Sequence, residues 1–125
     1  MTDSSSRRVV ITGMGAITPV GLNMPTAWQN VVAGKSGIGR ITLFPTDDFR
    51  VKIAGEAWGF KPTDFMSAKE ARRADRNVQF AIAATKEAIA QSRLAVTDAN
   101  REQVGVLIGS GAAGIWTYTA QQTVM

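Results

Sequence analysis

The sequence contains neither cysteine nor histidine. Without cysteine, the chain has no disulfide and no thiolate nucleophile. Without histidine, it lacks both the most common general base at neutral pH and the most common zinc ligand. The two absences weigh against a self-contained catalytic centre, and we expect neither a metal nor a cofactor.

Long apolar runs and strong charge are also missing. No apolar run approaches the roughly 20 residues that span a bilayer, so no membrane contact is expected. The formal net charge of +4 suits an acidic partner but is far from a nucleic-acid footprint. Arg7 and Arg8 precede an apolar stretch, as in a twin-arginine export signal. Because Gly13 and Pro19 interrupt that stretch, we expect a cytoplasmic protein.

The residues that are present predict one small α/β domain. The chain has 125 residues, of which 45% are hydrophobic. Residues 1–6 are polar and predict a flexible tail, and residues 7–125 predict the domain. Val9–Ile11 and residues 103–108 are apolar enough for strands buried in a parallel sheet, and a short strand is possible within residues 51–57. Residues 25–34 predict a helix that opens at a proline and closes at a glycine.

The strongest helical signal lies in the middle of the chain. Ser67 and Glu70 form a capping-box pattern for a helix of about 25 residues. At helical spacing, one side of this helix is rich in alanine and predicts a core face: Ala71, Ala74, Val78, Ala81, Ile82, Thr85 and Ile89. The opposite side carries a line of cations: Lys69, Arg72, Arg73 and Arg76.

The line of cations has two interpretations. It is either an ordinary solvated face, partly balanced by Glu70 and Asp75, or a docking surface for an acidic partner. Phe80 falls on the same side, and an exposed aromatic side chain there would indicate a partner surface, such as another subunit.

Two glycine-rich stretches follow the expected strands. The first, residues 13–21, lacks the third glycine of a dinucleotide fingerprint and the lysine of a P-loop. The second, "GSGAAG" at residues 109–114, fits G-x-G-x-x-G, so a small α/β module that binds a dinucleotide through Gly109–Gly114 is one hypothesis. The acidic residue expected about 20 positions later is missing, which favours a tight turn against closely packed backbone.

Four stretches together resemble one family. "RRVVITGMGAITPVG", "W…VVAGKSGIGRI", "KEARRADRNVQFAIAAT" and "VGVLIGSGAAG" are similar, in this order, to β-ketoacyl-acyl carrier protein synthases. The likeness is closest to the type II elongating enzymes and runs from Arg7 to about Gly114. It implies the N-terminal portion of the first half of a thiolase-like layered α/β/α fold, in a homodimeric acyltransferase.

The resemblance also implies a function. The family carries out the decarboxylative Claisen condensation of malonyl-carrier protein with an acyl thioester in fatty-acid biosynthesis. No residue of this chain matches the family's catalytic cysteine, histidines or lysine, so no catalytic residue is assigned and the chain alone is expected to be inactive.

Two sets of site residues are implied by the resemblance. Gly109, Gly111 and Ala112 match a wall of the acyl pocket, where elongating synthases often carry a bulkier aliphatic residue than Ala112. Lys69, Arg72 and Arg73 match the basic positions that dock acyl carrier protein.

Overall fold

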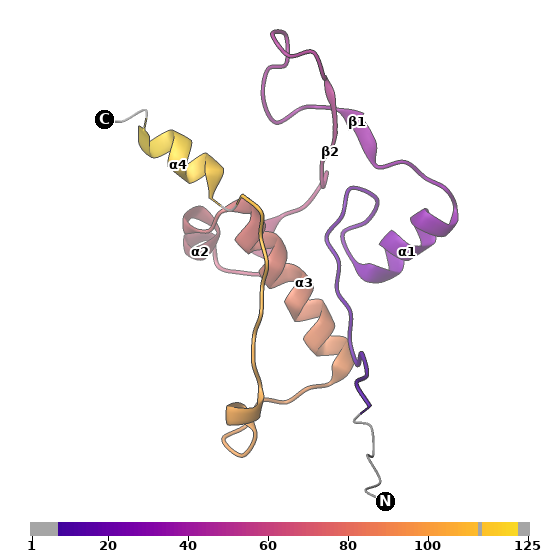
Figure 1. The fold of residues 1–125 in the computed structure, drawn as a ribbon, viewed down its shortest axis with the longest axis vertical. Coiled ribbons are helices and arrows are strands. Elements are labelled where there is room, and N and C mark those ends of the chain that lie inside the picture. The colour runs from indigo at the N-terminus through magenta and orange to yellow at the C-terminus, as the bar shows by residue number, and fades with distance from the viewer. Residues whose placement is uncertain (1–7, 113, 123–125) are drawn as a thin grey trace, which may run out of the picture.

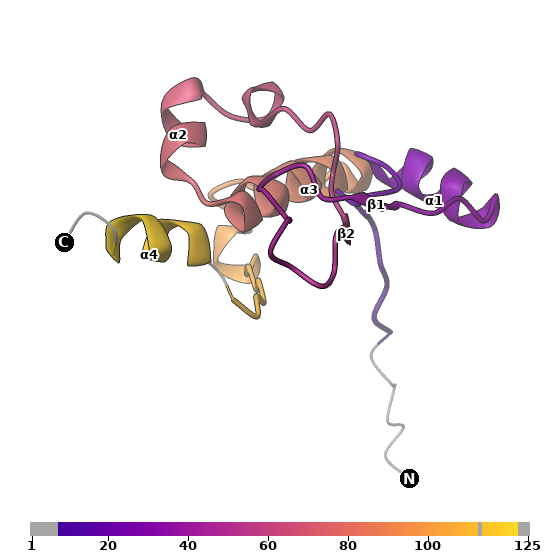
Figure 2. The same cartoon turned by 90° about the horizontal axis from the view of Figure 1, so that it is seen from above.

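The computed structural model describes residues 8–112 and 114–122. Its longest element is helix α3, Arg76–Ser92, and the other elements are arranged around it (Figure 1). Seen from above, helix α1 (Met24–Val32) lies towards one end of α3, while α2 (Ala68–Arg73) and α4 (Ile115–Gln122) lie towards the other (Figure 2). The expected tail of residues 1–6 lies outside the described residues, and the extent of the domain stays a prediction.

Helix α1 begins one residue before the predicted range of residues 25–34 and ends two residues before the end of that range. The Asn23 side chain accepts a hydrogen bond from the Thr26 amide at 2.8 Å, and Pro25 stands in the first turn. Gly34 follows the helix at a positive φ of 67°, which glycine adopts without steric cost. Ala27 is buried, whereas Trp28 stays 61% exposed, so this helix covers only a narrow part of the core.

Strands β1 (Ile38–Arg40) and β2 (Ile53–Gly55) form a two-stranded antiparallel sheet, with Gly39 opposite Ala54. A side chain at Gly39 would collide with the Trp58 ring, so glycine lets the indole pack on the strand. The possible strand within residues 51–57 is thereby confirmed at three of its positions.

The prediction of a single helix of about 25 residues is wrong. The chain forms α2, is extended at Ala74 and Asp75, and then begins α3. Asp75 occupies the N-cap of α3 with φ −61° and ψ 159°. Aspartate disfavours helix interiors and favours caps, so the break falls where the sequence allows it.

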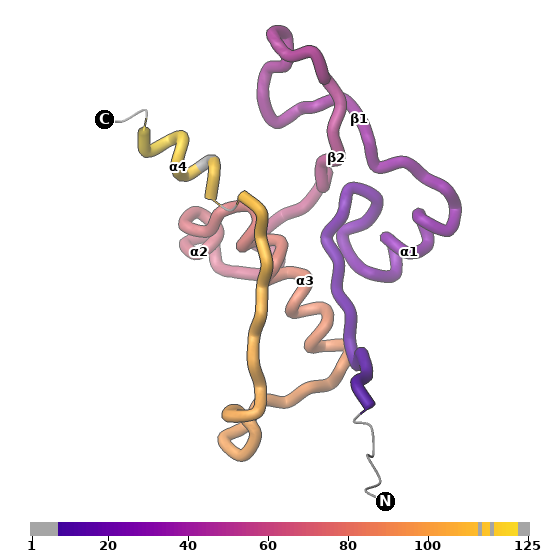
Figure 3. The backbone as a smooth tube through the Cα atoms, in the orientation of Figure 1, coloured from indigo at the N-terminus to yellow at the C-terminus, as the bar shows by residue number. Residues whose placement is uncertain are grey.

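The two expected parallel strands are also absent from the described residues. Val9 and Leu107 are 94% and 99% exposed, and neither segment belongs to a strand. Figure 3 shows the traces of residues 8–17 and 104–112 on either side of α3. A strand needs a neighbour to receive its backbone hydrogen bonds, and these segments do not pair. The start of the second is instead a 3-10 turn, Arg101–Gln103.

The described core is small and centres on α3. Ala27, Phe60 and Ala83 are its buried apolar residues, and Ala83 is only 1% exposed. The predicted alanine-rich core face is wrong in part, because Val78 and Ile89 remain more than 40% exposed. Gly13 and Gly15 contact α3 at the backbone of Ala88 and Ala84.

Candidate functional site

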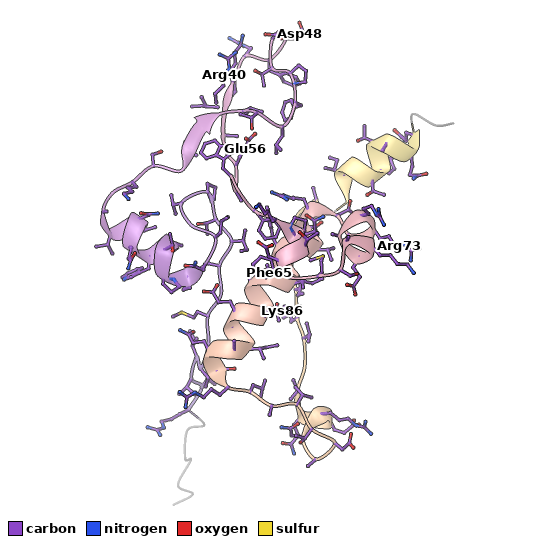
Figure 4. The ribbon with its side chains drawn as sticks, turned by 180° about the vertical axis from the view of Figure 1, so that it is seen from behind. Arg40, Asp48, Glu56, Phe65, Arg73 and Lys86 are labelled. Carbon is purple, nitrogen blue, oxygen red and sulfur yellow. The ribbon has the colours of Figure 1, made fainter. Side chains whose placement is uncertain are left out.

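Helix α2 presents three cations to solvent. Lys69, Arg72 and Arg73 are all exposed, and Arg73 points away from the molecule in Figure 4. Within residues 8–112 and 114–122, the ion pairs are those of Arg101 with Asp98 and Glu102. The three α2 cations therefore form no ion pair within the described chain and can receive an acidic partner. We call them the α2 basic surface.

The predicted capping box holds the first turn of α2. The Glu70 amide donates to the Ser67 hydroxyl at 3.2 Å, and the Ser67 amide donates to the Glu70 carboxylate at 2.9 Å. The Ser67 hydroxyl also donates to the Glu70 carboxylate, at 2.7 Å. The bonds that the carboxylate accepts from the Ser67 hydroxyl and amide lower the pKa of Glu70, because they favour its charged form. The capping box expected from the sequence is confirmed.

Helix α2 is also anchored at its other end. The Gln79 side-chain amide, from α3, donates to the carbonyls of Ala71 and Ala74 at 2.9 and 3.0 Å. The Lys86 ammonium donates to the Phe65 carbonyl just before the helix, and Figure 4 shows these two residues side by side. Six residues are too few for a helix to persist alone, so these bonds give the α2 basic surface its place.

The fourth cation of the expected line lies elsewhere. Arg76 follows the break and is half-buried, with its guanidinium 4.8 Å from the Phe60 ring centroid and 4.6 Å from that of Phe80. The two rings meet edge to face at 4.9 Å, and the Phe65 ring stacks on that of Phe60 at 5.6 Å. Phe80 therefore packs partly within the chain, and its interpretation as a partner surface stays a prediction.

A buried carboxylate organises the region beside this aromatic cluster. Glu56 is only 7% exposed and accepts hydrogen bonds from the Thr42 hydroxyl and amide at 2.6 and 2.9 Å. The Leu43 amide and the Trp58 indole also donate to it, at 3.2 and 2.9 Å. These bonds lower the pKa of Glu56 below its ordinary value, and those from Thr42 have the largest effect. Burial alone would raise the pKa, because it disfavours the charged carboxylate. Its side chain borders a cavity of about 240 Å³ that Arg76 also lines.

The first glycine-rich stretch serves packing. A Cβ at Gly13 would lie 2.1 Å from the Ala88 carbonyl oxygen, and one at Gly15 would lie 1.9 Å from that of Ala84. Both glycines therefore let the backbone lie directly on α3. This contact explains the stretch without any ligand.

Glu87 secures the same segment from α3. Its carboxylate accepts the Ala16 amide at 3.0 Å and the Met24 amide, at the start of α1, at 2.8 Å. Gln91, one turn further on, accepts the amide of Met14. Sequence reasoning missed both Glu56 and Glu87, because an acidic residue with backbone amide partners looks like any other acidic residue in the sequence.

The second glycine-rich stretch is not crowded by other described residues at Gly109 and Gly111. A Cβ at Gly109 or Gly111 would meet no atom within 4 Å. Ala112 lines a cavity of about 190 Å³ together with Asp75 and Gly114. The described residues thus bring Ala112 and Gly114 next to the α2–α3 break, which directly follows Arg73 of the α2 basic surface in sequence. They supply no backbone that crowds Gly109 or Gly111.

The chain matches one protein family over nearly its whole length. The family model of the β-ketoacyl synthase N-terminal domain matches residues 6–125, and the chain belongs to this family. The solved structure of the ishigamide ketosynthase/chain length factor superposes with a TM-score of 0.66 at 32% identity, over 71% of this chain and 22% of that one. The family and the thiolase-like fold implied by the four sequence motifs are therefore confirmed.

Curated relatives narrow the likeness to one kind of synthase. The chain is 40% identical, over its whole length, to 3-oxoacyl-[acyl-carrier-protein] synthase 2 of Synechocystis sp.. It is 44% identical over 115 residues, 92% of the chain, to the enzyme of the same name from Staphylococcus aureus. The chain spans 30% and 28% of the lengths of these two relatives.

No helix among the described residues is long and apolar enough to cross a membrane. The same residues hold no group of three or more acidic side chains that could bind a metal ion together.

Proposed function

We propose that this chain forms the N-terminal segment of a 3-oxoacyl-acyl carrier protein synthase of fatty-acid biosynthesis, a cytoplasmic homodimer. The reaction is the condensation of an enzyme-bound acyl thioester with malonyl-carrier protein, with loss of carbon dioxide. The observation that carries the proposal is the family match over residues 6–125, together with relatives whose printed name is that of this synthase.

The role of this segment is binding rather than bond-making. The chain has no cysteine and no histidine, so it offers neither a thiolate to hold the acyl group nor imidazoles to stabilise the enolate. The α2 basic surface docks the carrier protein, and Gly109, Gly111 and Ala112 form part of the acyl-pocket wall. By itself, the chain is inactive in condensation.

Docking is tested by changing Lys69, Arg72 and Arg73 to glutamate together. The experiment uses a chimaera in which this chain replaces the matching 28% of the Staphylococcus aureus relative. Each exposed pair contributes only about 0.2–1 kcal/mol, so the three act as a group. The KM for the carrier-protein substrate should rise strongly and lose much of its salt dependence.

Two controls make this test specific. Acyl groups on a small thiol carrier should react at unchanged rates, and Arg50→Glu, at an exposed position on another part of the chain, should leave the KM unchanged. Equal loss with both kinds of substrate would mean that α2 matters for folding and would refute docking.

The pocket wall is tested by Ala112→Phe in the same chimaera. A phenyl ring must occupy space that a long acyl chain uses, so the accepted chain length should shorten. Unchanged rates for short and long acyl substrates would remove Ala112 from the pocket.

The dinucleotide module was the alternative. It requires a strand before Gly109, and residues 104–108 form none in the described structure. Titrating the chain separately with NAD(P) and with acyl carrier protein distinguishes the two functions. Binding of the nucleotide alone would favour the module.

A further inference from the structure

The break between α2 and α3 touches the helix that follows the glycine loop. The Asp75 carboxylate accepts a hydrogen bond from the Thr117 hydroxyl of α4, although 42 positions separate them. An aspartate at an N-cap usually bonds the amides of its own helix, but the Asp75 side chain makes no such bond. Its acceptor capacity is directed at α4 instead.

Gly114, at the end of the glycine loop, fits against the same carboxylate. Its φ of 74° is positive, and a Cβ there would lie 3.0 Å from the Asp75 Oδ2. A side chain at position 114 would thus be strained by the backbone and would press on the carboxylate. The Gly114 carbonyl accepts the amide of Tyr118, which places this contact at the first turn of α4.

The two segments also enclose a common space. The cavity of about 190 Å³ is lined on one side by the break and the start of α3, and on the other by the glycine loop and the start of α4. Its lining residues are Asp75, Arg76, Asn77, Ala112, Gly114 and Ile115. A shift of residues 75–77, or of the loop and the start of α4, therefore alters the shape of this cavity. Ala112 is the residue proposed for the acyl-pocket wall.

The break is fixed on its α2 side as well. The Gln79 side-chain amide donates to the carbonyls of Ala71, within α2, and of Ala74, the residue immediately before Asp75. A continuous series of contacts thus runs from α2 through Asp75 to Thr117 and Gly114.

We propose that Asp75 is a positioning residue that fixes the glycine loop of residues 109–114 relative to the α2 basic surface. Binding of a carrier protein to α2 then restrains the loop through the Asp75–Thr117 hydrogen bond. The inference rests on the proposed function for its partner, but the bond and its effect on the loop belong to the chain itself.

The first test needs no partner. Amide hydrogen exchange of the full chain is followed by mass spectrometry in peptides that cover residues 104–122. Thr117→Val removes the hydroxyl donor while keeping the side-chain shape, and should speed exchange at residues 109–118 roughly tenfold, as expected when a hydrogen bond to a charged group is lost. Asp75→Asn is the second variant and should act in the same direction.

Two control variants leave the hydrogen bond between Asp75 and Thr117 intact. Thr119→Val removes a hydroxyl that donates to the Ile115 carbonyl within α4, and Asp98→Asn removes an exposed carboxylate far from the loop. Neither should change exchange at residues 109–114. Equal exchange in wild type and Thr117→Val, or equal acceleration by Thr119→Val, would overturn the positioning role.

The second test adds holo acyl carrier protein. In the wild type, exchange should slow both at residues 68–76 and at residues 109–114. In Thr117→Val, only residues 68–76 should be protected. Protection of both segments in both proteins would refute transmission through Asp75, whereas absence of protection at residues 68–76 would refute docking and leave the first test to decide the positioning role.

Discussion

Two apolar segments flank α3, and they differ in whether their backbone groups find hydrogen-bond partners. Residues 13–24 lie on the helix, with the amides of Ala16 and Met24 held by Glu87. Residues 104–108 are more strongly apolar, but Leu107 is 99% exposed and the segment pairs with no strand. The first segment finds its partners on a neighbouring helix, while the second requires a sheet.

The difference shows what a chain of this length can stabilise by itself. Contacts between a helix and a glycine-rich loop need only two elements, and both are present. A buried parallel sheet needs several strands and helices on both faces. The curated relatives are more than three times as long as this chain.

Gly15→Val should have the largest effect on stability. The new side chain would begin 1.9 Å from the Ala84 carbonyl oxygen, which belongs to the helix backbone and cannot rotate away. Residues 13–24 would have to leave α3, at a cost of 3 kcal/mol or more, above the usual ~1–3 kcal/mol for overpacking.

Urea unfolding of the chain measures this cost. Gly105→Ala is the matched control, because a Cβ at Gly105 meets no atom within 4 Å. A Gly15 variant as stable as the Gly105 variant would show that the segment does not lie on α3.

Glu87→Gln should have the next largest effect. The amide group retains one acceptor, but the second backbone amide then faces an NH₂ donor. Loss of a hydrogen bond to a charged group costs about 1.5–3 kcal/mol. The same urea experiment tests it, with Glu102→Gln as the control at a side chain that is 91% exposed. Equal small changes in both variants would contradict the role of Glu87 in holding residues 13–24.

Glu56→Gln should change how stability depends on pH. Because the pKa of Glu56 is lowered in the folded chain, its contribution is present above the unfolded value near 4.5 and is lost as pH falls below it. The wild type should therefore lose stability across this acid range more steeply than Glu56→Gln. Thr42→Val, which removes the hydroxyl donor that lowers this pKa most, should give an intermediate slope.

Unfolding free energies measured at intervals from pH 6 to pH 3 give these slopes. Parallel curves for the wild type and Glu56→Gln would show that the four donors do not favour the charged form in solution.

Leu107→Ser should have the smallest effect on folding. An exposed side chain far from packed neighbours changes stability by less than about 0.5 kcal/mol. Exposed apolar segments do promote association, so the variant should instead lower the concentration dependence of sedimentation. A loss of several kcal/mol would indicate that residues 104–108 are buried in the free chain.

The sequence predicted the features that depend on neighbouring residues. The proline in the first turn of α1, the Ser67–Glu70 capping box and the glycine after α1 are all local patterns with local causes. The helix break was missed because the alanine-rich helical spacing continues through Asp75. The spacing of apolar residues does not show that two residues within the pattern are extended. The family motifs identified the fold, although the sheet they belong to is not formed in the described residues.

The candidate site was predictable only in part. The exposure of Lys69, Arg72 and Arg73 follows from their helical spacing, but the separation of Arg76 from them follows from the break. The contacts of Asp75 with Thr117 and Gly114 join positions about 40 residues apart and leave no pattern in the sequence. The roles of the loop residues and of the α2 cations remain predictions to be tested as described.

The break at Ala74 and Asp75 also lets the outward residues of α2 vary independently of the residues that pack on α3. Because α2 ends there, its outward side chains can change without disturbing the aromatic cluster that Arg76 and Phe80 form on α3. Under the docking role proposed for α2, substitutions within residues 68–73 would be enough to adapt a synthase to a different carrier protein. Exchange of this short segment between relatives would then redirect an enzyme to a foreign carrier while its interior is left intact.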